Sequence, residues 1–254
     1  METTHHHHLE LHKLSTLSKV KPQTKLLGIF LIILSIAFFS MNNLKLFLIH
    51  VCCVIYLLFI SKISFKTYLK RLSIDIPFVL FAIFLPFISK GNGIIIGEYF
   101  GLTIYETGLI EMRNLIFKIT LCVTLAIILT ASTSTIEIIY GMQKLKISPL
   151  LISIFSFAIR YIDVFIDELK RVKTSMKSRG YSEKGLKNLQ PIAFASGAML
   201  IRGYERGERV YNSMISRGFN GYLELHDREY KNSNMIYLFG ILCLLTTIYD
   251  QVIL

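Results

Sequence analysis

Long apolar segments alternate with short basic segments along most of this chain. The run LLGIFLIILSIAFF, for example, contains no charged residue. A helix that crosses a bilayer needs roughly 20 mostly apolar residues, and five segments come close to this length. The pattern therefore predicts an all-α polytopic membrane protein with about five transmembrane helices, at Leu26–Met41, Leu44–Ile60, Leu72–Ser89, Asn114–Ser132 and Asn234–Ile253.

The segment 134–233 follows another pattern. Apolar residues recur every three or four positions at 162–176 and again at 193–214, a spacing that places them on one face of a helix. A shorter amphipathic piece, TIEIIYGMQKLKI, precedes both stripes. Small residues in and beside the second stripe would let two backbones approach closely. We therefore expect two long helices to cross at Gly197, Gly203 and Gly207.

Proline and glycine mark the ends of these two helices. Pro149 and Pro191 suit a first helical turn, and Gly180 and Gly218 suit the position just past a last turn. At about 1.5 Å per residue, a helix of about 30 residues reaches roughly 45 Å. The segment is therefore expected to form a domain of long crossed helices outside the membrane.

The composition excludes a soluble nucleic-acid-binding protein, so no nucleic-acid partner is expected. The 254 residues are 53% hydrophobic with a mean hydropathy of +0.53, although the formal net charge is +11. A soluble domain of this size could not bury so much apolar surface. The lipid bilayer is therefore the expected surrounding of the apolar segments.

Lysine and arginine predict the orientation, because cytoplasmic connections are enriched in both. Basic residues gather before the first span, between the second and third spans, and in 134–233, which holds 16 Lys+Arg against 10 Asp+Glu. The N-terminus is therefore expected in the cytoplasm. The predicted organisation is a cytoplasmic N-terminal segment at 1–25, transmembrane helices 1–4 at 26–133, a cytoplasmic domain at 134–233 and a C-terminal transmembrane helix at 234–254. The connection KGNGIIIGEYFGLTIYETG is then an outer loop, expected to contain an interfacial helix.

One ten-residue phrase occurs twice in the cytoplasmic domain. RVKTSMKSRG at 171–180 and RVYNSMISRG at 209–218 share seven of ten residues and lie 38 residues apart. The arginine near each end could complement the carbonyls of its own last helical turn. It could also form a planar, two-pronged contact with a carboxylate of another protein. We favour two docking ends that serve two equivalent partners, formed by Ser178, Arg179, Gly180, Ser216, Arg217 and Gly218.

Nearly the whole chain resembles the transmembrane T component of energy-coupling-factor (ECF) importers, most closely the CbiQ-like branch. HKLSTLSKVKPQTKLL is similar to the family's entry into the first span. FAIRYIDVFIDELKRVKTSMKSRGYS and MLIRGYERGERVYNSMISRGFNG resemble its two signature segments, which close on Ala-Arg-Gly or a variant. This chain has the small residue Ser in place of Ala at 178 and 216.

The resemblance implies a non-catalytic, energy-coupling subunit of an ABC-type importer in the cell membrane of a prokaryote. Its expected partners are two ABC ATPase subunits, identical or different, into which the ends at Arg179 and Arg217 insert, and a substrate-binding membrane S component. No catalytic residue, cofactor or metal site is expected, and the sequence contains no GxxxxGK[ST] phosphate loop. The branch implies cobalt or nickel uptake with a CbiM/CbiN-like S component. A T component shared among vitamins such as biotin and riboflavin, with a vitamin-specific S component, is the alternative.

An integral membrane enzyme is the competing class. Asp163, Asp167 and Glu168 could form a metal or phosphate site, but their helical spacing among basic residues favours salt bridges. The run 5–8 of four histidines, with His12, could bind nickel or cobalt or could be an unstructured or added terminus.

Several isolated residues have simpler interpretations. We expect His50 to be a packed residue of its span, and Asp75 to lie at the membrane interface beside Arg71. The four cysteines lack the spacing of a zinc site and are expected to be ordinary core thiols: Cys52, Cys53, Cys122 and Cys243.

Overall fold

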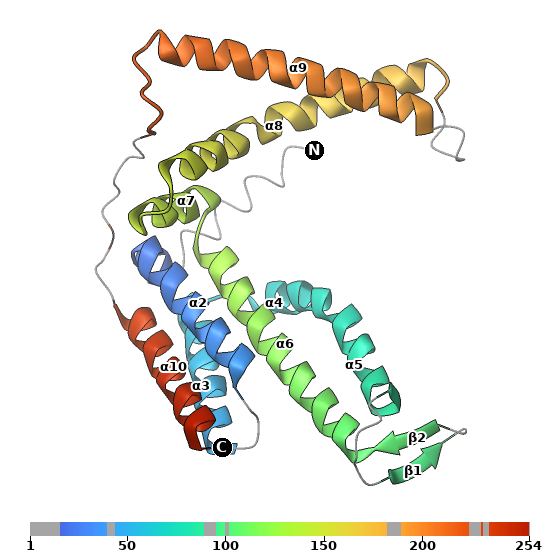
Figure 1. The fold of residues 1–254 in the computed structure, drawn as a ribbon, viewed down its shortest axis with the longest axis vertical. Coiled ribbons are helices and arrows are strands. Elements are labelled where there is room, and N and C mark those ends of the chain that lie inside the picture. Colours follow the sequence, from blue (N-terminus) through green and yellow to red (C-terminus); the bar gives the residue numbers. More distant parts are fainter. Residues whose placement is uncertain are drawn as a thin grey trace. The chain divides into compact units, whose positions relative to one another are not determined.

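Two compact units make up the computed structural model of this chain (Figure 1). The structure describes residues 16–39, 44–88, 95–99, 102–181, 189–223, 230 and 234–253. The first unit contains Met1–Gly141 and Asp227–Leu254, and the second contains Met142–His226. Helices form almost all of the described structure, as expected of an all-α polytopic membrane protein.

The first unit contains most of the apolar helices. They are α2 (Pro22–Phe38), α3 (Leu44–Ser61), α4 (Phe65–Leu72), α5 (Ile76–Ile88), α6 (Glu106–Ser132) and α10 (Met235–Ile253). By length and composition, α6 and Met235–Val252 of α10 could cross a membrane, and α2 and Phe47–Ser61 of α3 are shorter apolar helices. One helix of the second unit, α8 (Pro149–Ser178), meets the same criteria.

The helices α2, α3, α6 and α10 belong to this unit (Figure 1). Its core lies among them and the short 3-10 helix η1 (Thr16–Lys19) that precedes α2. Apolar side chains from all five elements form one buried cluster. Its members are Leu17, Val20, Ile29, Ile32, Ile36, Cys53, Val54, Leu57, Leu125, Ile128, Ile236 and Cys243.

Two glycines bring α2 and α10 into backbone contact. A Cβ atom at Gly28 would lie 2.6 Å from the carbonyl oxygen of Ile236. A Cβ atom at Gly240 would lie 2.8 Å from the carbonyl oxygen of Gly28. No real Cβ could occupy either place without moving a backbone, so this pair of helices requires glycine at both positions.

A polar contact inside the core joins three helices. The hydroxyl of Ser35 in α2 donates to the carbonyl of Cys243 in α10 at 2.8 Å. Its oxygen also lies 2.7 Å from Nε2 of His50 in α3. Because the hydroxyl has a single hydrogen, the His50 ring must donate in the second contact. His50 is 1% exposed, so the expectation of a packed histidine is confirmed.

The third expected span is shorter than the sequence suggested. A 3-10 turn, η2 (Ser73–Asp75), separates α4 from α5, and the 13 residues of α5 extend only about 20 Å. Asp75 is buried and accepts a hydrogen bond from Thr120 of α6 at 3.1 Å. The Asp75 carboxylate therefore faces α6, where a hydrogen-bond donor of the protein stabilises it, and among the described residues it forms no ion pair with Arg71.

The outer connection also differs from expectation. It contains an antiparallel hairpin of β1 (Ile95–Tyr99) and β2 (Leu102–Tyr105) in place of an interfacial helix. Its sequence, IIGEY and LTIY, is rich in β-branched and aromatic residues. Such residues favour strands, which accounts for the hairpin.

The second unit is an antiparallel pair of long helices, α8 and α9 (Leu189–Ile215). The boundary between the units falls inside α7 (Thr135–Lys144). At one end of the pair, the hydroxyl of Ser153 donates to the carbonyl of Gly221 at 3.3 Å. The rings of Phe157 and Phe219 lie 6.5 Å apart nearby. The chain that follows α9 thus returns to the beginning of α8.

Candidate functional site

The end of α8 is closed by a glycine in the left-handed conformation. Gly180 has φ +80°, and its N–H donates to the carbonyl of Lys177 at 3.0 Å. The N–H of Tyr181 donates back to the carbonyl of Met176 at 3.1 Å. This pair of bonds terminates the helix and requires the left-handed residue at its centre.

The end of α9 repeats this geometry bond for bond. Gly218 has φ +84°, its N–H donates to the carbonyl of Ile215 at 2.9 Å, and the N–H of Phe219 donates to the carbonyl of Met214 at 3.0 Å. The repeated phrase therefore encodes the same helix end twice. Glycine and the aromatic residue after it occupy equivalent places in both copies.

The two serines of the repeat belong to the helix ends themselves. The Ser178 hydroxyl donates to the carbonyl of Thr174 at 3.1 Å, and the Ser216 hydroxyl donates to the carbonyl of Asn212 at 2.9 Å. Each serine hydroxyl thus donates its hydrogen bond within its own helix. The side chain next to each arginine is therefore small and stays close to the helix.

Arg179 and Arg217 are both exposed. Among the residues that the structure describes, neither guanidinium makes an ion pair or donates a hydrogen bond to the carbonyls of its own helix. The helix-complementing alternative therefore gains no support from the observed contacts. Both side chains retain their full set of donors for another molecule.

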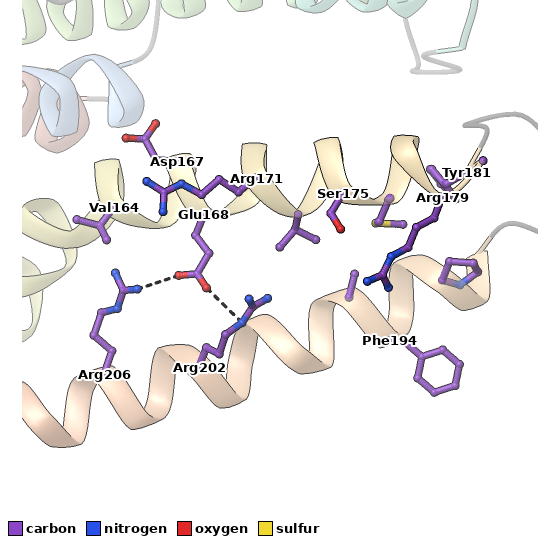
Figure 2. A pocket seen from close by; sticks show the side chains of 15 residues that line it. Val164, Asp167, Glu168, Arg171, Ser175, Arg179, Tyr181, Phe194, Arg202 and Arg206 are labelled. Carbon is purple, nitrogen blue, oxygen red and sulfur yellow. Dashed lines mark hydrogen bonds and ion pairs between the residues drawn. The ribbon is translucent and has the colours of Figure 1, made fainter.

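Each arginine lies beside a separate groove between the two helices. The Arg179 groove has a volume of about 1030 Å³ and is also lined by Pro191 and Phe194 at the start of α9 (Figure 2). The Arg217 groove has a volume of about 430 Å³ and is also lined by Phe157 and Arg160 near the start of α8. The two ends thus lie at opposite ends of the pair. The helical rise over the 27 residues of α9 separates them by roughly 40 Å.

The described ion pairs of the helical pair involve other basic residues and not Arg179 or Arg217. Glu168 of α8 receives Arg202 at 3.2 Å and Arg206 at 3.2 Å, both from α9 (Figure 2). Asp167 pairs with Lys170 of its own helix at 2.9 Å. Both acids are thus engaged in salt bridges, which argues against a catalytic carboxylate cluster with Asp163. Within the described ranges, no group of three or more metal-ligating side chains comes together.

Of the three glycines expected at the helix crossing, only Gly203 lies at a close approach. A Cβ atom there would lie 3.0 Å from the ring of Phe165. The corresponding positions at Gly197 and Gly207 have nothing within 4 Å. The Phe165 ring, which the stripe of small residues did not indicate, therefore lies against Gly203 at the helix crossing.

The remaining candidate residues contribute nothing to this site. The histidines at 5–8 and His12 lie outside the described residues. All four cysteines are free thiols in the first unit: Cys52, Cys53, Cys122 and Cys243.

Comparison with known proteins assigns the family. The family model described as "CbiQ: Cobalt transport protein" matches residues 13–228, which include both Arg-Gly ends. This chain belongs to the CbiQ family. It is a transmembrane T component of an ECF transporter.

Individual relatives agree with this assignment. Protein MJ1571 of Methanocaldococcus jannaschii is 28% identical over 209 residues, covering 78% of this chain and 71% of the relative. The "Energy-coupling factor transporter transmembrane protein EcfT" of Brevibacillus brevis is 26% identical over 223 residues, covering 82% of each chain. The protein of the same name in Staphylococcus aureus is 27% identical over 215 residues, covering 78% of each.

Replacing Gly180 or Gly218 by alanine is expected to distort one helix end of this T component. Neither glycine has an atom within 4 Å of its missing Cβ, so the cost comes from the positive φ alone. An L-residue in this conformation costs roughly 1–2 kcal/mol, or about a tenfold loss in any binding that requires the native end. Retention of the ATPase subunits by the detergent-purified chain measures the effect.

Gly207→Ala is the matched control for these two variants. It also has nothing within 4 Å of its missing Cβ, but it lies inside α9. Alanine is favoured over glycine there by up to about 1 kcal/mol, so this variant should bind as wild type or better. Equal losses in all three variants would mean that the left-handed conformation has no special role.

Proposed function

We propose that this T component couples ATP hydrolysis in two nucleotide-binding subunits to the movement of a separate substrate-binding membrane subunit. The observation that carries the proposal is the pair of matching helix ends at opposite ends of α8 and α9. Each end presents an exposed arginine with no ion pair among the described residues. Two separate, equivalent attachment points suit two related ATPase subunits.

A long helical pair could transmit motion between such attachment points. Packed helices shift as units and do not deform continuously. When ATP closes the two nucleotide-binding subunits, the docked ends would move relative to each other, and the pair would change its crossing geometry at Phe165 and Gly203. The chain continues from this pair through α7 into the first unit, which gives the motion a covalent route.

We place the helical pair on the cytoplasmic side of the cell membrane, with the N-terminus in the cytoplasm. The apolar first part of α8 is long enough to span a bilayer. However, α8 is tied to α9 by the Glu168 ion pairs with Arg202 and Arg206. A transmembrane α8 would draw these charges toward the hydrocarbon, which is costly. An interfacial position avoids this cost and leaves the apolar side chains for lipid or a membrane partner.

Cysteine labelling tests this topology. In a variant whose four native cysteines are replaced by alanine, a cysteine at position 98 in the hairpin should react with an impermeant maleimide added to intact cells. A cysteine at position 173 in α8, which is exposed and lines neither groove, should react only after the cells are opened. Labelling of position 173 in intact cells would contradict the cytoplasmic placement of the helical pair.

We propose cobalt or nickel as the cargo, carried by a CbiM/CbiN-like S component. The description of the matching family as cobalt transport proteins supports this choice. A T component shared among vitamin-specific S components is the alternative. Uptake of radiolabelled cobalt, nickel, biotin and riboflavin by cells with and without the gene for this chain decides between them.

The proposed subunit does not itself hydrolyse ATP. The purified chain should show only background hydrolysis in lipid nanodiscs, whereas the complex with its nucleotide-binding subunits should hydrolyse ATP. The isolated chain is then replaced by a variant that lacks Asp163, Asp167 and Glu168. If that variant still hydrolyses ATP, the activity comes from a contaminant. Hydrolysis that disappears with these three acids would instead support the membrane-enzyme alternative.

A further inference from the structure

The two grooves are lined by the same positions of the repeated phrase. Positions 1, 5 and 9 line the Arg179 groove as Arg171, Ser175 and Arg179. The same positions line the Arg217 groove as Arg209, Ser213 and Arg217. The structural equivalence of the two copies therefore extends two helical turns back from the Arg-Gly ends.

Positions at which the two copies differ line neither groove. Position 3 is Lys173 or Tyr211, position 4 is Thr174 or Asn212, and position 7 is Lys177 or Ile215. Helix formation and termination alone would not require the same residue at positions 1 and 5, which lie well before the end. The shared residues at positions 1, 2, 5, 6 and 9 thus follow the groove surface, whereas the shared serine at position 8 and glycine at position 10 serve the helix end.

The grooves also share a pattern of burial. The arginines and serines at positions 1, 5 and 9 are exposed in both copies. Val172 and Met176 in one copy, and Val210 and Met214 in the other, are half-buried and line the grooves between the arginines. Each groove therefore has an apolar strip with a guanidinium at each end, about 12 Å apart along the helix axis.

Within the described part of the chain, the first arginine of each phrase forms no ion pair, although the hydrogen bond from Lys170, together with the charge of Arg171, lowers the pKa of the Asp167 carboxyl. Glu168 is occupied by Arg202 and Arg206. Among the described residues, Arg171 and Arg209 take part in no ion pair, like Arg179 and Arg217. A guanidinium fork matches a carboxylate in geometry and charge, so each groove offers two guanidinium groups with which no carboxylate of the described residues pairs directly.

We infer that each groove binds an acidic segment of one nucleotide-binding subunit, with Arg171 and Arg209 as second anchors beside Arg179 and Arg217. This inference rests on the proposed function and specifies the partner's chemistry. The segment presents two carboxylates about 12 Å apart, with an apolar side chain between them that contacts the Val–Met strip. Because the two grooves share these residues, the two subunits carry the same arrangement.

The affinity of the full chain for its nucleotide-binding subunits tests this inference. The chain is purified in nanodiscs containing phosphatidylglycerol. The two nucleotide-binding subunits that co-purify with the wild type are then added back at known concentrations. Replacing Arg171 and Arg209 together by glutamine should weaken binding by about 100-fold, or roughly tenfold for each guanidinium removed. The exposed positions of both residues should leave the chain monodisperse.

Lys173→Gln with Lys177→Gln is the matched control. It removes two positive charges from the first copy of the phrase, at positions that line neither groove. This variant should stay within about threefold of the wild type. Replacing Arg171 and Arg209 by lysine should restore only part of the affinity, since an ammonium keeps the charge but not the fork.

Two results would overturn the inference while leaving the proposed function intact. In the first, the variant that lacks Arg171 and Arg209 binds like the wild type, whereas the variant that lacks Arg179 and Arg217 does not bind. Docking would then be confined to the helix ends. In the second, the variant that lacks Arg171 and Arg209 loses bound phosphatidylglycerol with unchanged subunit affinity, which assigns the grooves to lipid headgroups. If removal of all four arginines leaves the affinity unchanged, the proposed function itself is wrong.

Discussion

Replacing both Arg179 and Arg217 by alanine is expected to abolish substrate uptake while leaving the first unit folded and inserted. Each arginine is proposed to pair with a carboxylate of one nucleotide-binding subunit. Truncating one partner of such a pair typically costs about 2–5 kcal/mol, which corresponds to roughly a 30- to 5000-fold loss per site. Either single variant should therefore be impaired, and the double variant should retain no coupling.

Uptake of labelled substrate by intact cells measures this effect, with the amount of membrane-inserted chain determined in parallel. Arg228→Ala removes a basic residue outside the repeat and should change uptake little. Lysine at 179 or 217 should rescue poorly because an ammonium cannot reproduce the planar guanidinium. Normal uptake by the double alanine variant would mean that the repeated phrase serves only to end two helices.

Replacing Gly28 by valine is expected to separate α2 from α10 and destabilise the first unit. The first added carbon alone would lie 2.6 Å from a backbone oxygen of Ile236, and a backbone cannot move aside as a flexible side chain can. Overpacking of this kind costs about 3 kcal/mol. For a chain of this size, that energy corresponds to a fall in the melting temperature of roughly 6–12 °C.

Thermal unfolding in detergent, followed by size-exclusion chromatography of a fluorescent fusion, measures this loss. Gly197→Val is the control, because nothing lies within 4 Å of its missing Cβ. It should leave the melting temperature unchanged or slightly higher, because valine has a higher helix propensity than the glycine it replaces. A similar melting temperature for both variants would show that the contact between α2 and α10 is not a close one.

The local signals in the sequence predicted the long helices well. Pro149 begins α8, and Gly180 follows its end with a positive φ, because the start and stop preferences of a helix depend on nearby residues only. The repeat likewise identified two equivalent ends before their hydrogen bonds were known.

Features that depend on distant contacts could not be predicted in this way. Lys25 belongs to the basic segment before the first expected span, yet it is fully buried and donates to the carbonyl of Ser132 at 3.2 Å. Its partner lies 107 residues away. Asp75 similarly depends on Thr120 of another helix. Such residues take their environment from tertiary packing, on which the charge pattern alone carries no information.

The grooves were missed because each combines two antiparallel helices. Arg160 and Arg217 line one groove although 57 positions separate them in the chain. The sequence did contain one indication of the grooves. The two copies of the phrase have the same residues at positions 1 and 5, which lie before the Arg-Gly end. That identity acquires a meaning only when α8 and α9 are placed side by side.

The central claim is that each Arg-Gly end contacts a different nucleotide-binding subunit, and one cross-linking measurement tests it directly. A photoreactive benzoylphenylalanine is placed at both Ser178 and Ser216 of the full chain in its assembled complex, and the irradiated product is sized by denaturing electrophoresis and mass spectrometry. We expect a product that joins one T component to two nucleotide-binding subunits, with only binary products when either position is used alone. If both positions cross-link to a single nucleotide-binding subunit, or if neither reaches one, the claim of two separate docking ends is contradicted.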